Sequence, residues 1–275
     1  MKPARFDYVR AEHLAEVHDV LAENGNDARV IAGGQTLLPM LSMRLARPKV
    51  VVDIMHLPQL QTIDADKGTI RIGAGVRQAQ LLGWPLLSDR QPLLAAALPW
   101  VGHAQTRNRG TICGSLAHAD PSAEIPLVLV ALGGTIELSS RRGRRRIAAD
   151  IFFTGMMSTA RSEDELIEAA ILPARPTGSG YAFQEFGRRH GDFAIAACAA
   201  VATDKGTRLA VAGVADRATM HDFAALDGSA LDDALDAFAW DLDARDDLHA
   251  TARYRRELVR RMGRAVIEEA RRCRA

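Results

Sequence analysis

Two short stretches rich in small residues are the part of this sequence best suited to hold an anion. The first reads IAGGQTL, from Ile31 to Leu37, and the second reads TICGS, from Thr111 to Ser115. Small residues leave backbone N–H groups open to a ligand, and hydroxyl groups add donors. Each stretch alone is also typical of a tight connection, but two at strand–helix junctions predict one shared diphosphate site. Arg107 and Arg109 would add positive potential beside the second stretch.

Other motifs for nucleotide or metal chemistry are weaker. Gly73 and Gly75 follow a predicted strand, but Gln78 stands where a Rossmann fingerprint needs a third glycine. A strand end is the simpler interpretation. His118 and Asp120 resemble a metal pair, yet a turn or helix-start role is favoured because further ligands are missing nearby. No Ser-His-Asp arrangement is legible, so we expect neither a catalytic nor a metal-ligating residue in this chain.

Composition narrows the classes of function. Of 275 residues, 48% are hydrophobic and 25% are charged, with a formal net charge of +1. This balance favours neither nucleic acid nor an anionic membrane as a partner, and no run approaches the ~20 apolar residues of a membrane span. The N-terminus lacks a signal-peptide core, so we expect a cytoplasmic protein. The three cysteines lack the spacing of a zinc or iron–sulfur site, so redox chemistry requires an organic cofactor or a partner's metals.

The two stretches suited to bind an anion lie among predicted helices and strands. Apolar periodicity predicts helices over residues 11–25, 36–46, 77–84, 92–103, 123–132 and 252–275. Strands are predicted over residues 28–34, 49–54, 68–76, 164–173, 181–189, 193–202 and 208–216, with a basic hairpin over 134–150. The Pro-, Gly- and Ser-containing segment 175–180 is the best linker candidate. We therefore predict an α+β protein with a first domain over 1–176, made of subdomains at about 1–55 and 56–176, and a second over 178–275.

Three stretches carry a family resemblance: Ala32 to Pro48, Arg107 to Glu124 and Tyr181 to Ala196. In this order they resemble the FAD-binding medium subunit of molybdenum hydroxylases, a family that includes the flavoprotein subunit of carbon monoxide dehydrogenase and the flavin domain of xanthine dehydrogenase. The likeness runs over nearly the whole chain. It implies a vanillyl-alcohol-oxidase-type (PCMH-like) FAD-binding domain of two α+β subdomains, followed by a smaller C-terminal α+β domain.

The resemblance also implies which residues contact FAD. The first stretch would wrap the diphosphate from one side and the second from the other. Glu124 would contact polar atoms of the cofactor, and Ile167 would lie near the adenine or the ring system. Asp192 and Phe193 would lie over the isoalloxazine, where such groups control access and potential. The implied cofactor-binding set is Ile31, Ala32, Gly33, Gly34, Gln35, Thr36, Leu37, Val101, Thr111, Ile112, Cys113, Gly114, Ser115, Glu124, Ile167, Gln184, Asp192 and Phe193.

This sequence departs from the family pattern at two places. Cys113 stands where many relatives have a third loop glycine, which removes one source of backbone freedom. Gln184 and Glu185 stand where relatives often carry a lysine close to the flavin. A lysine would stabilise anionic reduced flavin, whereas Glu185 would do the opposite if it faced the ring. The sequence therefore supports no expectation about the flavin potential.

The function implied is that of an electron-transfer oxidoreductase subunit that carries FAD. Electrons would come from a small [2Fe–2S] subunit, after a large molybdenum-cofactor subunit oxidises the substrate, and would pass to quinone, oxygen or NAD. The assembly implied is a heterotrimer or its dimer. Two alternatives stay open: a self-sufficient FAD-dependent oxidase or reductase, and a flavin-less nucleotide-binding or scaffolding module.

Two arginine-rich segments allow two interpretations each. Arg141 to Arg146 is most simply a solvated hairpin tip, with docking of a partner subunit as the alternative. The helix over residues 252–275 carries many arginines and one apolar face, which favours partner contact slightly more.

Overall fold

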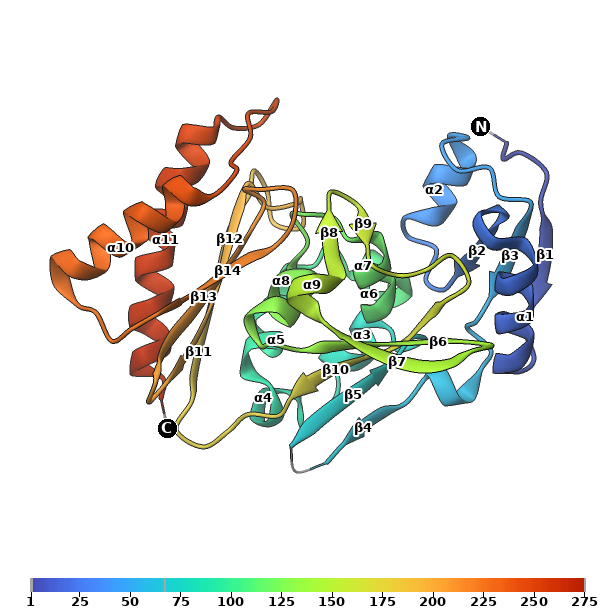
Figure 1. The fold of residues 1–275 in the computed structure, drawn as a ribbon, viewed down its shortest axis with the longest axis horizontal. Coiled ribbons are helices and arrows are strands. Elements are labelled where there is room, and N and C mark those ends of the chain that lie inside the picture. Colours follow the sequence, from blue (N-terminus) through green and yellow to red (C-terminus); the bar gives the residue numbers. More distant parts are fainter. Residues whose placement is uncertain (1, 67, 275) are drawn as a thin grey trace.

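The computed structural model describes residues 2–66 and 68–274, which form three larger sheets with helices between and beside them (Figure 1). The N-terminal unit lies at one end, a five-stranded sheet occupies the middle, and a four-stranded sheet with two long helices lies at the other end. A two-stranded ribbon, β8 (Phe153–Gly155) and β9 (Ser158–Thr159), stands above the middle sheet. The mixture of helices and strands confirms the predicted α+β class. Within the described ranges, no helix combines the length and apolarity that crossing a membrane requires.

The N-terminal unit is a small parallel sheet in the order β1-β3-β2, packed against one helix. Val52 of the central strand and Val17 and Leu21 of the helix are almost fully buried. His13 caps the helix by accepting from the Glu16 N–H at 3.2 Å. The predicted helix and two strands are confirmed, but the first strand was missed because its residues are exposed and not patterned. The elements are β1 (Asp7–Arg10), α1 (Leu14–Asn24), η1 (Gly25–Asp27), β2 (Ala28–Ile31), α2 (Leu37–Ser42) and β3 (Val50–Asp53).

The middle of the molecule is an antiparallel sheet in the order β4-β5-β10-β6-β7, with short helices packed on one face. Ile72, Ile136 and Ala170 are fully buried in the core between the sheet and these helices. The strands are β4 (Ile63–Ala65), β5 (Thr69–Gly73), β6 (Thr135–Ser140), β7 (Gly143–Ala148) and β10 (Leu166–Pro173). The helices are η2 (Pro58–Leu60), α3 (Gln78–Leu82), α4 (Leu87–Arg90), α5 (Pro92–Ala97), η3 (Leu98–Trp100), α6 (Ala104–Arg109), α7 (Ile112–His118), α8 (Glu124–Ala131) and α9 (Ala149–Phe152).

The basic hairpin lies at the edge of this sheet, and its arginines pair with carboxylates of neighbouring elements. Arg146 and Arg71 share Glu137, and Arg144 binds Glu168 at 2.8 Å. Arg141, Arg142 and Arg145 pair with Asp19, Asp164 and Glu165, respectively. The hairpin tip is exposed, as predicted, but its charge is largely neutralised within the chain. The docking alternative therefore loses its main support.

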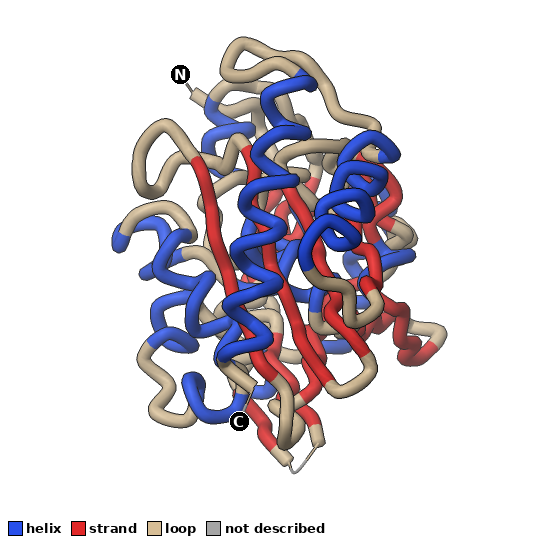
Figure 2. Tube along the Cα trace, turned by 90° about the vertical axis from the view of Figure 1, so that its left-hand side faces the viewer, coloured by secondary structure: helices blue, strands red, loops and turns tan. Residues whose placement is uncertain are grey.

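The C-terminal part is a meander in the order β11-β12-β13-β14, covered on one face by two helices (Figure 2). The apolar face of the last helix is buried against this sheet; its buried residues include Val259, Met262, Val266, Ile267 and Ala270. The expectation that this face meets a partner was therefore wrong, because the chain's own sheet covers it. The elements are β11 (Gly180–Phe186), β12 (Ala196–Thr203), β13 (Gly206–Ala212), β14 (Thr219–Phe223), α10 (Gly228–Asp241) and α11 (Ala252–Arg272).

The opposite face of the meander packs on the middle of the molecule. Ala197, Ala199 and Ala210 belong to the same buried core as the central sheet. Alanines at these positions let α8 approach β12 and β13 closely. The predicted division at about residue 177 falls in the segment between β10 and β11. The division into domains stays a prediction, because the two parts share one continuous core.

Candidate functional site

The structure brings the two glycine-containing stretches into contact. We call residues 32–36 the first loop and residues 110–115 the second loop. The first loop connects β2 to α2, with Ile31 ending the strand and Leu37 beginning the helix. A Cβ atom at Gly33 would overlap the carbonyl oxygen of Arg109 and approach the Cα of Gly110 at 2.7 Å. The space that a side chain would need at Gly33 is therefore filled by backbone at the start of the second loop.

The first loop presents its backbone N–H groups without protein acceptors. Among the described residues, no hydrogen bond is donated by the backbone N–H groups from Ala32 to Leu37. Gly34 has φ +71°, a left-handed conformation that favours glycine. Helix α2 then begins, with the Leu38 N–H donating to the Gly34 carbonyl at 3.0 Å. Gln35 is exposed, and its amide Nε2 donates to the Gly33 carbonyl at 3.3 Å. A run of free donors on one short loop suits a ligand with several acceptor oxygens.

The second loop is largely the beginning of a helix. Thr111 caps α7, with its Oγ1 accepting from the Gly114 N–H at 3.0 Å and its carbonyl accepting from the Ser115 N–H at 3.3 Å. The Ile112 N–H donates to the Val76 carbonyl at 3.2 Å. The expectation that this stretch lies between a strand and a following helix was wrong, because α6 precedes it and the Thr111 cap starts α7 at Ile112, so that Gly114 and Ser115 lie inside the helix. Gly114 is exposed and Thr111 is buried.

Cys113 fits the second loop without strain. Its backbone is helical rather than left-handed, so no glycine is needed at this position. The side chain is 3% exposed, and its Sγ contacts the Ile72 carbonyl at 3.7 Å. Burial raises the pKa of the thiol to about 12. Cys113 is therefore a buried, unreactive packing residue rather than an obstacle to the turn.

The two arginines beside the second loop, Arg107 and Arg109, differ in their contacts and exposure. Arg107 donates from Nη1 to the carbonyls of Pro99, Val101 and Gly102, at 2.9 to 3.2 Å. It therefore stabilises the segment before α6 rather than offering a free charge. Arg109 ends α6 and is exposed. Val101, 7% exposed, is held by Arg107 in the segment that enters α6.

Residues predicted near the flavin ring lie in the segment after β11. Asp192 forms an ion pair with Arg188 at 3.4 Å, and the Phe193 side chain is 59% exposed. This segment packs against residues 100–103, because a Cβ at Gly191 would lie 2.5 Å from Nδ1 of His103. The structure therefore brings residues 187–193 to the chain segment that leads into α6 and the second loop.

The alternation along β11 separates Gln184 from Glu185. Gln184 is exposed and shares a face with Phe186, whose ring contacts Tyr254 of α11 at a centroid distance of 6.1 Å. Glu185 shares the other face with Phe183, whose ring lies 6.4 Å from that of Trp100. The period of two in a strand thus directs Glu185 to the same side of the sheet as Trp100. The role of Gln184 in cofactor binding stays a prediction. The sequence did not place Glu185 among the cofactor-binding residues.

The remaining predicted residues are buried. Glu124 begins α8 and is 4% exposed. Burial, and then the charge of Asp120, raises the pKa of Glu124 to about 7. Ile167 is 4% exposed and lies in β10 next to a β-bulge that precedes Ala169.

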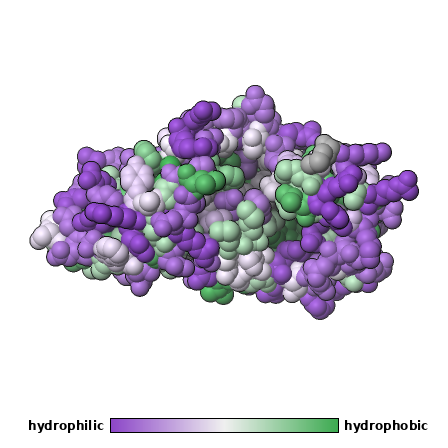
Figure 3. Space-filling model, turned by 90° about the horizontal axis from the view of Figure 1, so that it is seen from above, coloured by the Kyte–Doolittle hydropathy of each residue, from purple (hydrophilic) through white to green (hydrophobic). Residues whose placement is uncertain are grey.

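The surface is hollowed near its middle when the molecule is seen from above, and apolar side chains gather on both sides of the hollow (Figure 3). Helix α2 and the β8–β9 turn project on this side. Their exposed apolar residues include Leu38, Met43, Met156 and Met157. These side chains lie on elements that follow the first loop or contact α7, since the Met157 N–H donates to the Ala119 carbonyl at 3.1 Å.

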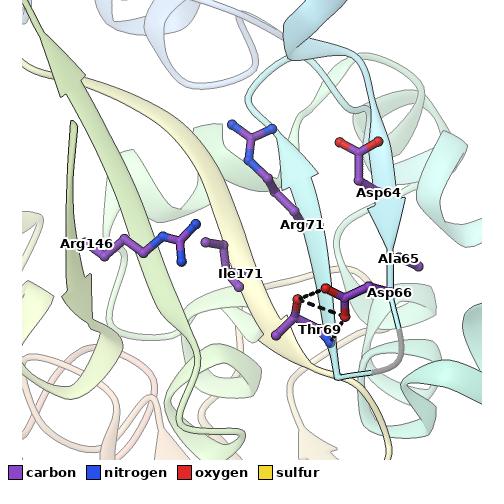
Figure 4. Close-up of a pocket in the computed structure, with 7 residues that line it drawn as sticks. All are labelled: Asp64, Ala65, Asp66, Thr69, Arg71, Arg146 and Ile171. Carbon is purple, nitrogen blue, oxygen red and sulfur yellow. Dashed lines mark hydrogen bonds between the residues drawn. The ribbon is translucent and has the colours of Figure 1, made fainter. Parts of the chain in front are cut away.

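Two pockets contain none of the predicted residues, although Arg77 of the second one pairs with Thr111 of the second loop. One pocket, of about 320 Å³, lies on the outer face of the central sheet (Figure 4). The Asp66 carboxylate there accepts a hydrogen bond from the Thr69 N–H, and Arg71 of β5 and Arg146 of β7 also line the pocket. Because Arg71 and Arg146 are both paired with Glu137, neither arginine offers an unpaired positive charge to an anionic ligand. The other, of about 510 Å³, is lined by Gln61, Gly75, Arg77, Ala79, Gln80 and Asn108.

Comparison with known proteins gives the same assignment over the whole chain. Residues 4–175 match the family model described as FAD binding domain in molybdopterin dehydrogenase, and residues 181–270 match the CO dehydrogenase flavoprotein C-terminal domain. The 6-hydroxypseudooxynicotine dehydrogenase complex subunit alpha of Paenarthrobacter nicotinovorans is 38% identical, over 98% of this chain and 96% of its own. The carbon monoxide dehydrogenase medium chain of Hydrogenophaga pseudoflava is 33% identical, over 98% of both chains.

Solved structures agree with these sequence relatives. A chain of the Hydrogenophaga pseudoflava carbon monoxide dehydrogenase that lacks the Mo-pyranopterin moiety superimposes with a TM-score of 0.94, at 32% identity and over 100% of both chains. A chain of quinoline 2-oxidoreductase from Pseudomonas putida 86 superimposes with a TM-score of 0.91, at 32% identity and over 99% of both chains. Sequence, fold and the two joined loops together show that this chain belongs to the FAD-binding medium subunits of the molybdenum hydroxylase family.

Proposed function

We propose that this chain binds FAD with the diphosphate against the first loop and that it serves as an electron-transfer subunit. The observation that supports the proposal most is the run of backbone N–H groups from Ala32 to Leu37 that find no acceptor among residues 2–66 and 68–274. The contact between Gly33 and Arg109 holds this run in place. A diphosphate has several acceptor oxygens and negative charge, which this run of donors matches. The second loop would form the other side of the site, with the backbone of Arg109 and Gly110 packed against Gly33.

The chain's residues would bind and orient the cofactor rather than act on a substrate. FAD, when bound, can take electrons singly and release them in pairs. The first loop would fix the diphosphate, and the segment containing Asp192 and Phe193 would limit access to the ring. Glu124 and Glu185 lie on the elements that join the two parts of the chain and would set the charge of that region. No acid–base residue acting on a substrate is required.

Partner subunits follow from the relatives, several of which are described as a medium chain or a subunit of a complex. We infer that a large molybdenum subunit and a small [2Fe–2S] subunit associate with this chain, as a heterotrimer or its dimer, in the cytoplasm. Electrons would leave for an external acceptor such as quinone, oxygen or NAD. The alternatives, a self-sufficient flavin oxidase and a flavin-less scaffold, are not favoured because the relatives match as subunits along their whole length.

The cofactor is tested by the absorbance spectrum of the purified chain, with chromatographic identification of the chromophore released by heat. We expect the two-band spectrum of an oxidised flavin and release of FAD rather than FMN. A colourless chain that does not take up added FAD would contradict the proposal.

The subunit role needs a separate test. A tagged copy of this chain should co-purify from its native cells with two polypeptides, together with molybdenum and iron in a fixed ratio. Substrate oxidation should require those polypeptides. An isolated chain that oxidises a substrate by itself would instead favour the self-sufficient enzyme.

A further inference from the structure

A loop between the first two strands of the C-terminal sheet carries two residues predicted to lie over the flavin ring. We call residues 187–195 the β11–β12 loop; it includes Asp192 and Phe193, and the Phe193 side chain is 59% exposed. The Ile195 N–H donates to the Phe186 carbonyl at 2.8 Å and closes the base of the loop. The position of Phe193 therefore depends on the elements that hold this loop.

Arg255 of α11 binds the end of the β11–β12 loop from inside the protein. It is 4% exposed, and its Nη1 donates to the Ile195 carbonyl at 2.5 Å and to the Gly213 carbonyl. Its Nη2 donates to the Asp247 carboxylate, also at 2.5 Å. A buried guanidinium is tolerated when its donors are paired in this way. One side chain thus joins the loop, the residue after β13 and the segment before α11.

Backbone packs tightly around the carbonyls that Arg255 binds. Gly213 has φ +78°, and a Cβ there would lie 2.8 Å from the Ala194 carbonyl oxygen and 2.9 Å from that of Ile195. The Gly213 N–H donates at 2.8 Å to the carbonyl of Pro121, which lies between α7 and α8. The junction around Arg255 is therefore continuous with the part of the chain that matches the FAD binding domain.

The residue next to Arg255 contacts the other end of the same loop. The Tyr254 ring lies edge-on to that of Phe186, at a centroid distance of 6.1 Å. Thr251 caps the helix, with its Oγ1 accepting from the Tyr254 N–H at 3.2 Å. The first turn of α11 therefore contacts the β11–β12 loop at both of its ends.

On its other side, the loop is held by contacts between more exposed groups. The His190 ring lies 5.0 Å from the Trp100 ring, and Gly191 packs against His103. Both histidines are exposed. Hydrogen bonds from a charged group, made away from water, are stronger than contacts of this kind. We therefore expect Arg255 to contribute most to the position of the loop.

We propose that Arg255 is a positioning residue that holds the β11–β12 loop, and Phe193 with it, where the loop limits access to the bound flavin. It acts through the carbonyls of Ile195 and Gly213 rather than by contact with the cofactor. The effect on access rests on the proposed function. The hold on the loop is a property of the chain without its cofactor.

The hold on the loop is tested by hydrogen–deuterium exchange of the full chain stripped of FAD. Arg255→Met removes all three hydrogen bonds and keeps much of the apolar stem. Amide exchange in peptides that cover residues 187–195 should become at least about tenfold faster, because hydrogen bonds to a charged group are lost. Peptides from α1 should exchange as in the native chain. Native-like exchange of the loop in a folded Arg255→Met variant would overturn the proposal.

Arg256→Met is the matched control, because Arg256 is the next residue of α11 and also donates to two backbone carbonyls. Its acceptors, Ala239 and Leu242, lie at the end of α10 rather than in the loop. This variant should speed exchange near residues 239–242 and leave residues 187–195 as in the native chain. Equal loosening of the loop in the two variants would mean that loss of any arginine from this turn weakens the C-terminal sheet, and the positioning role would be rejected.

Arg255→Lys decides the question if Arg255→Met does not fold. Lysine keeps the charge, but its compact ammonium replaces a planar group that reaches acceptors on three segments. At least one hydrogen bond should be lost, so exchange of residues 187–195 should rise by a smaller factor, about threefold. A folded Arg255→Lys variant with native protection of the loop would reject positioning by the guanidinium.

Access to the flavin is tested separately, in chains loaded with FAD. Quenching of the bound flavin's fluorescence by acrylamide, an uncharged quencher, should be about twofold stronger in Arg255→Met, because a looser loop shields the ring less. Arg256→Met should match the native chain. A looser loop with unchanged quenching would show that the loop does not cover the flavin and would overturn the proposal. A native chain that binds no FAD would instead contradict the proposed function, while the exchange measurements would still decide the role of Arg255.

Discussion

The first loop leaves its backbone N–H groups free, whereas the second loop uses several of its own to start helix α7. From Ala32 to Leu37 no backbone donor is satisfied within the described chain, but the N–H groups of Ile112, Gly114 and Ser115 all have protein acceptors. The first loop therefore supplies the free backbone N–H donors, and the second loop mainly supplies the backbone that packs against the first. Similar small residues thus perform different tasks in the two loops.

The glycines show the same difference. Gly33 is required because the backbone of Arg109 fills the side-chain space, and Gly34 because its φ is +71°. In the second loop, a Cβ at Gly114 would meet only the side chain of Thr111, with Oγ1 at 2.8 Å, and no backbone of another segment. Substitutions should therefore damage the first loop more than the second, and this expectation orders the experiments below.

Gly33→Ala should have the largest effect. The added methyl group overlaps the Arg109 carbonyl and forces the two loops apart, which we expect to lower the free energy of unfolding by about 1–3 kcal/mol. FAD content after purification should fall sharply, because the free donors no longer stand against the second loop. Gly114→Ala is the matched control and should keep most of its FAD. Equal FAD loss in the two variants would contradict the contrast between the loops.

Gly34→Ala should be next in effect, for a conformational reason. A non-glycine residue held in the left-handed region costs about 1–2 kcal/mol, and the Cβ also approaches Leu38 Cδ1 at 2.9 Å. Gly34→Asn should lose less stability than Gly34→Ala, because asparagine adopts this region more readily. Urea unfolding of the two variants measures the difference. If alanine were the better tolerated of the two, the left-handed conformation would not be the cause.

Thr111→Ala tests the capping role of the second loop. Loss of the hydroxyl leaves the Gly114 N–H without its acceptor, and we expect a cost of about 1 kcal/mol in the free energy of unfolding. Thr111→Ser keeps the oxygen and should restore most of that stability. FAD affinity should change less than in either glycine variant. A Thr111→Ala variant with native stability but no FAD would show that this hydroxyl binds the cofactor instead.

The sequence was sufficient to locate both loops, because clustered glycine and threonine residues have local signatures, although the second loop connects α6 to α7 rather than a strand to a helix. It did not reveal why Gly33 is glycine, since that depends on the approach of Arg109, far away in the chain. The start of α7 was missed because Thr111 caps the helix without an acidic residue three positions later. A tertiary contact thus explains the requirement for glycine at position 33, and an incomplete capping signal explains why the start of α7 was missed.

Pairing with other elements explains why the arginines of the 141–146 hairpin, although exposed as predicted, carry little free charge. The acidic partners of the 141–146 hairpin lie on α1, on β6 and around β10, between 9 and 122 residues away in the sequence. A local count of charge could not anticipate that neutralisation. The orientation of Glu185, by contrast, could have been predicted from the sequence, because strict alternation along β11 places its side chain on the opposite face from that of Gln184.

Cys113→Gly should have the smallest effect on cofactor binding, even though it restores the glycine of many relatives. Cys113 is already in helical conformation, and its Sγ fills a buried position against Ile72. Glycine would add backbone freedom to the unfolded chain and leave a small void, so we expect about 1 kcal/mol lower stability and FAD affinity unchanged within about twofold. Calorimetric titration of FAD into the stripped variant measures the affinity. A clear gain in affinity would mean that the second loop contributes mobile backbone donors, which would remove the distinction between the two loops.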